Sequence, residues 1–374
     1  MLDFASALYL GLRHPSWSLK PWNEFTMGKP AVLRSPASAT ATAQQLAQLH
    51  GCEAATLGAS TLHLFWDLFG LLAQGRITIF VDAGTYPIAR WGVERAAGRG
   101  VRTTTFAHHD ADALWRQLRS SAASGGSPVV VTDGFCPGCG SPAPLSTYLQ
   151  HARVFGGSLV LDDTQALGIF GRAPDPAVPY GVGGGGMLPW SKINGPDVLV
   201  VSSLAKAFGV PIAVLAGSRS AIRAFEDSSK TRMHCSPPSI AVIHALAHAL
   251  EINSSFGDRL RQRLMHLVRR FRQGMAAARF RFIGDLFPVQ TLITSENTDV
   301  IALYRELLAA QVSAVLRSGG PTRAGLLSFL ITARHSSGDV DRATQALVMA
   351  SSEISRLNDS GVSYVQPDLF TGTF

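Results

Sequence analysis

The chain has 374 residues, of which 46% are hydrophobic and 16% are charged, and its formal net charge is +7 at pH 7. This composition excludes an intrinsically disordered chain, and the length predicts two domains that share a cleft. Four cysteines are too few for a disulfide scaffold in so long a chain. The basic residues are scattered and form no nucleic-acid-binding motif, so we expect no nucleic-acid partner.

The first residues and the apolar segments bear on localisation. The start of the chain, Met1-Leu2-Asp3-Phe4, lacks the pattern of a signal peptide. No apolar run is as long as a membrane span. We therefore expect a soluble, cytoplasmic protein with no membrane partner.

Strand-like and helical segments alternate from Thr40 onward. The predicted helices are 40–50, 61–74, 87–97, 111–120 and 145–155, and the predicted strands are 77–81, 101–106, 128–132, 158–161, 198–202 and 211–215. Continuous apolar strands separated by helices predict an α/β fold with a mostly parallel sheet and helices on both faces. Ligands bind such sheets beyond the carboxyl ends of the strands, so we expect functional residues directly after strands.

The pattern changes in the last third of the chain. A long helix is predicted over 240–271 with a break near 253–256, followed by strands 288–294, 312–316 and 326–332 and helices 300–310 and 339–357. These elements predict a smaller α+β domain. We place the large domain at 40–250 and the small C-terminal domain at 251–374, with residues 1–39 as an irregular segment that packs on the small domain. The stretch 174–196, which contains Gly183–Gly186, is typical of a mobile loop.

Two carboxylates, Asp162 and Asp163, follow the buried strand at 158–161. A carboxylate at this point could keep the pyridine nitrogen of pyridoxal phosphate (PLP) protonated, which preserves the ring as an electron sink. A helix cap or a metal ligand is the alternative interpretation.

A lysine, Lys206, follows the strand at 198–202. Just past a strand end and in a cleft, a lysine loses its proton easily and can form an imine. Ser203 could bind a phosphate, and so could Ser60 and Thr61 at the start of the helix at 61–74, where backbone N–H groups are free. An isolated lysine is usually a surface residue, and Ser60 alone is better explained as a helix cap, but the strand that ends at Asp162 favours the functional interpretation of Lys206.

Two other motifs favour no metal site. A single C-x-x-C pair, Cys136 and Cys139, has no second pair with which to bind zinc, and we interpret it as a loop feature, with redox activity as a minor alternative. The run His108-His109-Asp110 could suggest a metal site, but it occurs in a motif shared with a known family, and that resemblance implies a corner between a strand and a helix.

Seven short motifs occur in a shared order along nearly the whole chain. They are Phe4–Leu12, Phe106–Asp110, Val131–Gly134 with Ala143–Leu145, Leu161–Gly168, Ser203–Gly209, Ser236–Pro238, and Ile331–His335 with Asp339–Asp341. In these motifs the chain resembles the α-oxoamine synthase family, which includes 8-amino-7-oxononanoate synthase. The family belongs to the fold-type I PLP-dependent enzymes of aminotransferase class I/II, so the resemblance implies an aspartate-aminotransferase-like fold.

The resemblance implies that PLP is the cofactor and assigns residues to it. Lys206 would carry PLP as a Schiff base, Asp162 would contact the pyridine nitrogen, and Tyr86 would stack on the ring where the family has a histidine. Ser60 and Ser203 would help to bind the cofactor's phosphate, and His234 falls near a position that reaches the phosphate of the partner subunit. The other implied cofactor-binding residues are Thr61, Leu62 and Gln165. Arg317 falls near the family's substrate-carboxylate arginine.

The reaction that the resemblance implies joins an amino acid to an acyl thioester, either acyl-CoA or an acyl carrier protein, in a decarboxylative condensation to an α-amino ketone. A homodimer with the active site between the subunits is implied as well. The chain departs from the family pattern at Gln165, Tyr86, Leu326 and Ser328. These departures leave two alternatives: an aminotransferase on the same scaffold, or a non-catalytic partner subunit.

Overall fold

A computed structural model describes residues 1–33, 35–122, 125–294, 298–317 and 325–359. The chain forms two compact units. The first contains residues 1–9, 137–141 and 260–374, and the second contains residues 10–136 and 142–259. None of the described helices combines the length and the apolar character needed to cross a membrane.

The second unit is built on a seven-stranded sheet. In spatial order its strands are β2 (Ala54–Gly58), β10 (Ala213–Gly217), β9 (Val198–Ser203), β8 (Ser158–Asp162), β5 (Ser127–Asp133), β3 (Ile77–Asp82) and β4 (Arg102–Phe106). β10 runs in the direction opposite to that of the other six strands of this sheet, which are parallel to one another. The predicted mostly parallel sheet is confirmed. The strand β2 was not predicted, because its small residues Ala54, Ala55 and Gly58 weaken the strand pattern.

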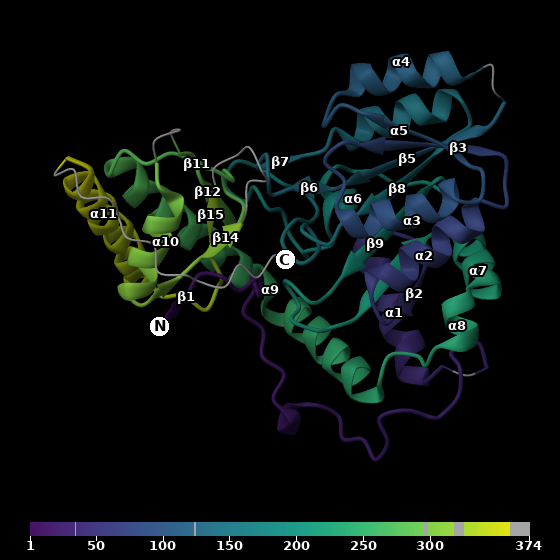
Figure 1. Cartoon of the computed structure of the whole chain (residues 1–374). Helices are drawn as coiled ribbons and strands as arrows, with labels where there is room; N and C mark the ends of the chain where they lie inside the picture. The colour runs from purple at the N-terminus through teal and green to yellow at the C-terminus, as the bar shows by residue number, and fades with distance from the viewer. Residues whose placement is uncertain (34, 123–124, 295–297, 318–324, 360–374) are drawn as a thin grey trace. The chain divides into compact units, whose positions relative to one another are not determined.

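Helices flank this sheet on both faces (Figure 1). They are α1 (Ala37–His50), α2 (Thr61–Leu72), α3 (Pro87–Ala97), α4 (Ala111–Ser121), α5 (Leu145–Val154), α6 (Met187–Trp190), α7 (Arg219–Ser228) and α8 (Lys230–His234). On one face, residues of α2, α3 and α7 form a buried cluster with alternate strand residues such as Ile79, Val131 and Val201. Side chains alternate along a strand, so Phe80 and Val130, which are also fully buried, face the opposite layer.

The first unit contains a four-stranded antiparallel sheet. Its strands are β11 (Phe282–Ile283), β12 (Val289–Leu292), β15 (Leu326–Leu330) and β14 (Val315–Arg317), and its helices are α10 (Val300–Ala309) and α11 (Ser337–Asp359). The strand predicted at 312–316 is wrong as a single element. Val312–Ser313 (β13) pairs with Leu2–Asp3 (β1), and only after Ala314 does β14 pair with β15.

One helix, α9 (Ile240–Ala277), contributes residues to both units. The predicted break near 253–256 is wrong, because the polar side chains there are satisfied without interrupting the helix. The Nδ2 atom of Asn253 donates to the carbonyl of Gly183 at 2.9 Å, and the Oγ atom of Ser254 donates to the carbonyl of Glu251 at 2.9 Å.

The glycine-rich stretch is packed and hydrogen-bonded, in contrast to the mobile loop that its composition predicts. The backbone N–H of Gly168 donates to Gly184, and that of Gly186 donates to Phe170, at 2.8 and 2.7 Å. The short helix α6 follows directly. Other short elements are the 3-10 helix Ser16–Ser18 and the strands β6 (Phe135–Cys136) and β7 (Ser141–Pro142).

Candidate active site

Polar residues stand at the carboxyl ends of four neighbouring parallel strands. β3 ends at Asp82, β5 at Asp133, β8 at Asp162 and β9 at Ser203. In the sheet register Asp133 is directly paired with Asp162, and Asp162 with Val201. This edge of the sheet is where ligands bind in parallel α/β folds.

Asp162 is a buried carboxylate with a structural hydrogen bond. Its side chain is nearly inaccessible, and its Oδ1 atom accepts from the backbone N–H of Thr164 at 3.0 Å. Burial raises the pKa of Asp162, and the Thr164 hydrogen bonds and the nearby charge of Lys206 oppose that shift. The ionised form of Asp162 is therefore stabilised by a cationic neighbour.

Lys206 lies in the connection between β9 and β10. This connection is short and tied at both ends, since the N–H of Leu204 donates to Ile212 at 2.9 Å and the N–H of Val210 donates to Leu204 at 3.0 Å. Burial lowers the pKa of Lys206, while the charges of Asp162 and Asp133 oppose the shift. A half-buried lysine with a lowered pKa supplies the neutral amine that imine formation requires.

Ser203 connects the two strands that carry these groups. Its backbone N–H donates to Oγ1 of Thr164 at 3.0 Å, and its own Oγ accepts from the N–H of Ala205 at 3.3 Å. The turn after Asp162 is thus bonded to the start of the Lys206 segment.

The start of α2 presents unpaired backbone groups. Ser60 is extended at the N-cap position, and its Oγ contacts Nδ1 of His63 at 2.8 Å instead of capping the helix. The N–H groups of the first helical residues, Thr61 and Leu62, have no partner within the helix. Such a helix start is suited to bind a phosphate. His63 was missed by the sequence analysis because no motif marks it.

Tyr86 lies next to the paired carboxylates. It is the residue before α3, its side chain is 55% exposed, and its backbone N–H donates to Oδ1 of Asp133 at 3.1 Å. Its ring is therefore accessible to a ligand at this sheet edge.

Asp133 is a site residue that the sequence analysis did not single out. Burial and the charge of Asp162 raise its pKa well above the ordinary value for an aspartate. The signal was present, because Asp133 ends the apolar strand β5 in the same way as Asp162 ends β8.

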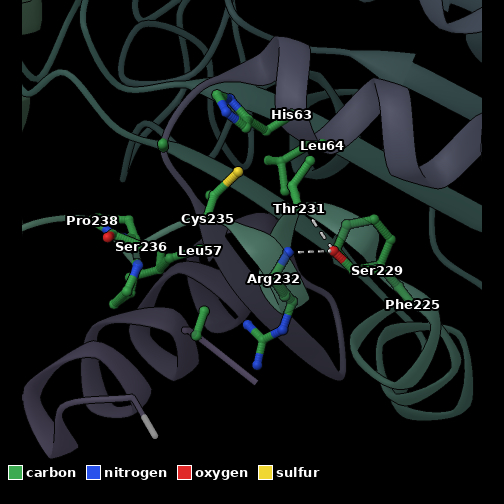
Figure 2. Close-up of a pocket in the computed structure, with 14 residues that line it drawn as sticks. Leu57, His63, Leu64, Phe225, Ser229, Thr231, Arg232, Cys235, Ser236 and Pro238 are labelled. Carbon is green, nitrogen blue, oxygen red and sulfur yellow. Dashed lines mark hydrogen bonds between the residues drawn. The ribbon is translucent and has the colours of Figure 1, made fainter. Parts of the chain in front are cut away.

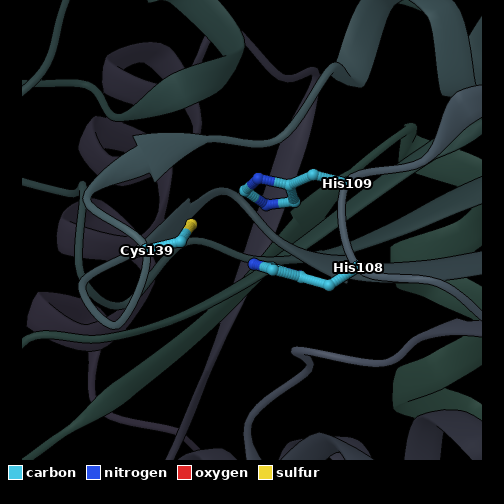
Figure 3. Close-up of side chains that lie close together, drawn as sticks. All are labelled: His108, His109 and Cys139. Carbon is cyan, nitrogen blue, oxygen red and sulfur yellow. The ribbon is translucent and has the colours of Figure 1, made fainter.

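A second group of polar residues at this edge is centred on Asp82, at the end of β3. The buried carboxylate of Asp82 accepts from His108 Nδ1 at 2.6 Å, from the N–H of Gly84 at 2.7 Å, from the N–H of His109 at 3.0 Å and from the hydroxyl of Tyr148 at 3.1 Å. The rings of His108 and His109 lie 3.8 Å apart between centroids (Figure 3). These bonds fix the corner between β4 and α4 to the end of β3.

The remaining predicted residues are Gln165, His234 and Arg317. Gln165 is half-buried in the turn after β8. His234 is exposed at the end of α8. Arg317 is exposed at the end of β14 and belongs to the first unit.

A pocket beside β2 and α2 has a different character (Figure 2). Its lining includes His63, Leu64, Arg232 and Cys235 but neither Lys206 nor Asp162. The backbone N–H of Arg232 donates to Oγ of Ser229 at 3.2 Å, a local bond that caps α8. This bond serves the local fold.

The residues at the sheet edge fit PLP. An amine with a lowered pKa suits its aldehyde, a buried carboxylate that favours a cationic neighbour suits its pyridine nitrogen, and the start of α2 suits its phosphate. The fold and these groups define an α/β enzyme of the aspartate-aminotransferase type.

The chain belongs to the aminotransferase class I and II family, whose sequence model matches residues 23–347. The 8-amino-7-oxononanoate synthase of Sodalis glossinidius is 28% identical over 92% of this chain and 87% of that protein. The enzyme of the same name from Methylococcus capsulatus is 29% identical over 93% of this chain and 89% of that protein.

Two solved structures are similar throughout. A structure of SPT with PLP has a TM-score of 0.80 at 16% identity and covers 96% of this chain and 88% of that chain. The 8-amino-7-oxononanoate synthase of Francisella tularensis has a TM-score of 0.71 at 17% identity and covers 95% of this chain and 98% of that chain. The predicted fold and the predicted family are both confirmed.

Proposed function

We propose that this protein is a PLP-dependent acyltransferase. It joins an amino acid to an acyl thioester, acyl-CoA or acyl carrier protein, by a decarboxylative condensation that gives an α-amino ketone. The observation that carries the proposal is the pair of a half-buried amine, Lys206, and a buried carboxylate, Asp162, at adjacent strand ends. The names of the matched relatives support the type of reaction.

The cofactor would be held by residues of the second unit. Lys206 would bind PLP covalently, and Asp162 would hold a proton at the ring nitrogen. The phosphate would be bound by the N–H groups of Thr61 and Leu62 and by the hydroxyls of Ser60 and Ser203. When bound, PLP withdraws electrons from the α-carbon of an amino acid.

Side chains of the protein would carry out the remaining steps. With a lowered pKa, the amine of Lys206 would accept the α-proton of the amino acid as a general base. Tyr86 would stack on the cofactor ring, and Gln165 would contact its edge. Arg317 would bind the carboxylate of the amino acid through a paired contact.

We further propose a cytoplasmic homodimer. In such a dimer His234 would reach the phosphate of the partner's cofactor. Support for a dimer comes from Leu62, Trp66 and Trp91, large apolar side chains on α2 and α3 that are exposed in a single chain.

An aminotransferase on the same scaffold is the second candidate. Gln165 and Tyr86 stand where the α-oxoamine synthases that the chain resembles have histidines, and both residues are compatible with an aminotransferase. An aminotransferase would convert bound PLP to pyridoxamine phosphate with an amino acid alone. An acyltransferase would release a free thiol only when both substrates are present.

The test uses the purified full-length protein loaded with PLP. We expect a visible absorbance band that is lost in Lys206→Ala and kept in Lys230→Ala, a change on α8. Amino acids are then added singly, with and without acetyl-CoA as a probe thioester, while thiol and pyridoxamine phosphate are measured. A visible band that survives Lys206→Ala would contradict the site assignment, and pyridoxamine phosphate without thiol would establish the second candidate.

A further inference from the structure

The glycine segment Gly183–Gly186 packs against three parts of the second unit, which are α9, the end of α1 and Asp163. The backbone N–H of Gly183 donates to Oδ1 of Asp258 at 2.9 Å, and its carbonyl accepts from Asn253 at 2.9 Å. Both of these partners are on α9, so the segment is attached to that helix at its first residue.

The last two glycines leave no room for a side chain. A Cβ atom on Gly185 would lie 2.0 Å from the carbonyl oxygen of Leu49, at the end of α1. A Cβ atom on Gly186, where φ is +88°, would lie 1.8 Å from Oδ2 of Asp163. The segment therefore passes between α1 and the carboxyl group of Asp163, and only glycine fits at both positions.

Asp163 is the centre of this arrangement. Its side chain is completely buried, and its Oδ2 atom accepts from the backbone N–H of Met187 at 2.8 Å. Its Oδ1 atom lies against Gly134, where a Cβ would come within 2.4 Å. Gly134 follows Asp133, and its N–H donates to the carbonyl of Asp162 at 2.8 Å. The carboxyl of Asp163 thus lies between the glycine segment and the ends of β5 and β8.

The surroundings of Asp163 oppose a charge on it. Among the described residues, Oδ1 has no hydrogen-bond partner, and no cation is paired with the group. Burial and the neighbouring charge of Asp162 raise its pKa well above the ordinary value, against the opposing effect of the Met187 hydrogen bond. A buried carboxyl without a cationic partner is most stable as the neutral acid.

We propose that Asp163 is a positioning residue for Asp162: as a neutral acid it binds the glycine segment 183–186 at the N–H of Met187 and fixes the strand ends that carry Asp133 and Asp162. The proposal rests on the role of Asp162 proposed above. It also gives the glycine segment a function, which is to bring a backbone donor to a carboxyl group that has no space for a larger neighbour.

The experiment compares Asp163→Asn and Asp163→Leu in the full-length protein. Asparagine keeps an oxygen acceptor without charge, whereas leucine has the same branching of heavy atoms, two larger methyl groups in place of the oxygens, and no acceptor. The readouts are the pH at which the visible band of bound PLP changes, kcat and KM, and the thermal midpoint without cofactor. Asp67→Asn serves as the control, because Asp67 is also a buried aspartate but is paired with Arg95 and bonded to Ser229 and Thr231.

We expect Asp163→Asn to match the wild type in the pH midpoint of the band. Asp163→Leu should move that midpoint by about one pH unit or more and lower kcat by about tenfold or more, with less change in KM. Asp67→Asn should lower the thermal midpoint without moving the pH midpoint. This contrast separates a positioning role from a loss of stability.

Two results would overturn the proposal. A folded Asp163→Leu protein with the wild-type pH midpoint would show that Asp163 positions nothing, and an Asp163→Asn protein as impaired as Asp163→Leu would show that the charge is required. If Asp163→Leu does not fold, Gly186→Ala replaces it, because the added Cβ atom would displace Oδ2 of Asp163. We expect the same shift of the pH midpoint and the same loss of kcat. Asp162→Asn is measured in parallel. If this change leaves the visible band unaltered, the result contradicts the proposed function and not the role of Asp163.

Discussion

His50 is a histidine without access to water. It ends α1, its side chain is completely buried, and neither ring nitrogen has a hydrogen-bond partner among the described residues. Burial lowers the pKa of His50 to about 4, and the nearby backbone of Gly185 opposes the shift. The His50 ring is therefore still neutral in the folded protein at a pH at which the same ring is already protonated in the unfolded chain.

This difference predicts a loss of stability on mild acidification. Between the ordinary histidine pKa of about 6.5 and the folded value, the unfolded state binds a proton that the folded state does not, so the free energy of unfolding falls as the pH falls. From pH 7 to pH 5 His50 should account for about 2 kcal/mol of the decrease. Urea unfolding at the two pH values should show a smaller decrease in His50→Gln.

The exposed histidine His266, on α9, provides the control for this prediction. The decrease should be unchanged in His266→Gln. An equal decrease in the wild type and His50→Gln would mean that His50 is not the group that titrates.

The candidate site was predictable in part. Asp162 and Lys206 could be found because each follows an apolar strand and lies in a recognisable motif, and the sheet register then pairs Asp162 with the strand that leads to Lys206. The contacts of His63, Asp82 and Asp163 depend on turns and on neighbours distant in sequence. Spacing along one strand carries no information about such contacts.

The pair α2 and α3 shows how close packing requires a glycine inside a helix. Gly92 is an interior residue of α3, and a Cβ there would lie 2.5 Å from the ring of Phe69 and 2.9 Å from the backbone carbonyl oxygen of Phe65. The ring could move, but the backbone of α2 has no such freedom in a packed core. The close approach of the two helices therefore depends on this position.

Replacing this glycine sets two effects against each other. Alanine favours a helix over glycine by about 1 kcal/mol, whereas overpacking a core costs about 1–3 kcal/mol. Because the opposing atom is backbone, we expect overpacking to dominate, so that Gly92→Ala lowers the free energy of unfolding by about 1 kcal/mol. Urea unfolding measures the change.

The control change lies at the end of the same helix. Gly98 is in the right-handed helical region, and a Cβ there would have its nearest contact at 3.5 Å, with Glu94. Gly98→Ala should be neutral or stabilising. If Gly92→Ala proves stabilising as well, the helices are less tightly packed than the structure indicates.

The helices were predicted correctly where residues at their ends mark the boundary. Pro87 at the start of α3 and Asp110 at the cap of α4 placed both helices correctly. The missed strand β2 is made of small residues and gains its place by pairing with β10. The false break in α9 came from polar residues whose partners, such as Gly183, are far away in the sequence.

Large apolar side chains on neighbouring elements of the second unit remain exposed in a single chain. On α2 they are Leu62 and Trp66, at 39% and 44% exposure, and at or on α3 they are Tyr86 and Trp91, at 55% and 46%. Exposed apolar groups that cluster in this way often mark protein–protein contacts. Tyr86 belongs to the candidate site, so a contact here would lie beside the proposed cofactor.

We therefore expect light scattering to give twice the chain mass of 39.8 kDa. Trp91→Glu should weaken the dimer, because the charge would have to be buried in the contact. Val154→Glu, which changes a more accessible apolar residue on α5 (66% exposed, against 46% for Trp91), should leave the mass unchanged. A monomeric wild type would contradict the dimer, and an unaffected Trp91→Glu dimer would place the contact elsewhere.

The reversed direction of β10 has a mechanical consequence for Lys206. Because β10 returns beside β9, the lysine stands on a hairpin whose two arms are both anchored in the sheet, instead of on a long crossover that could swing. Its terminal nitrogen can then travel only through the four torsions of its own side chain. Any atom that the Lys206 amine contacts during catalysis must therefore lie within reach of this one side chain.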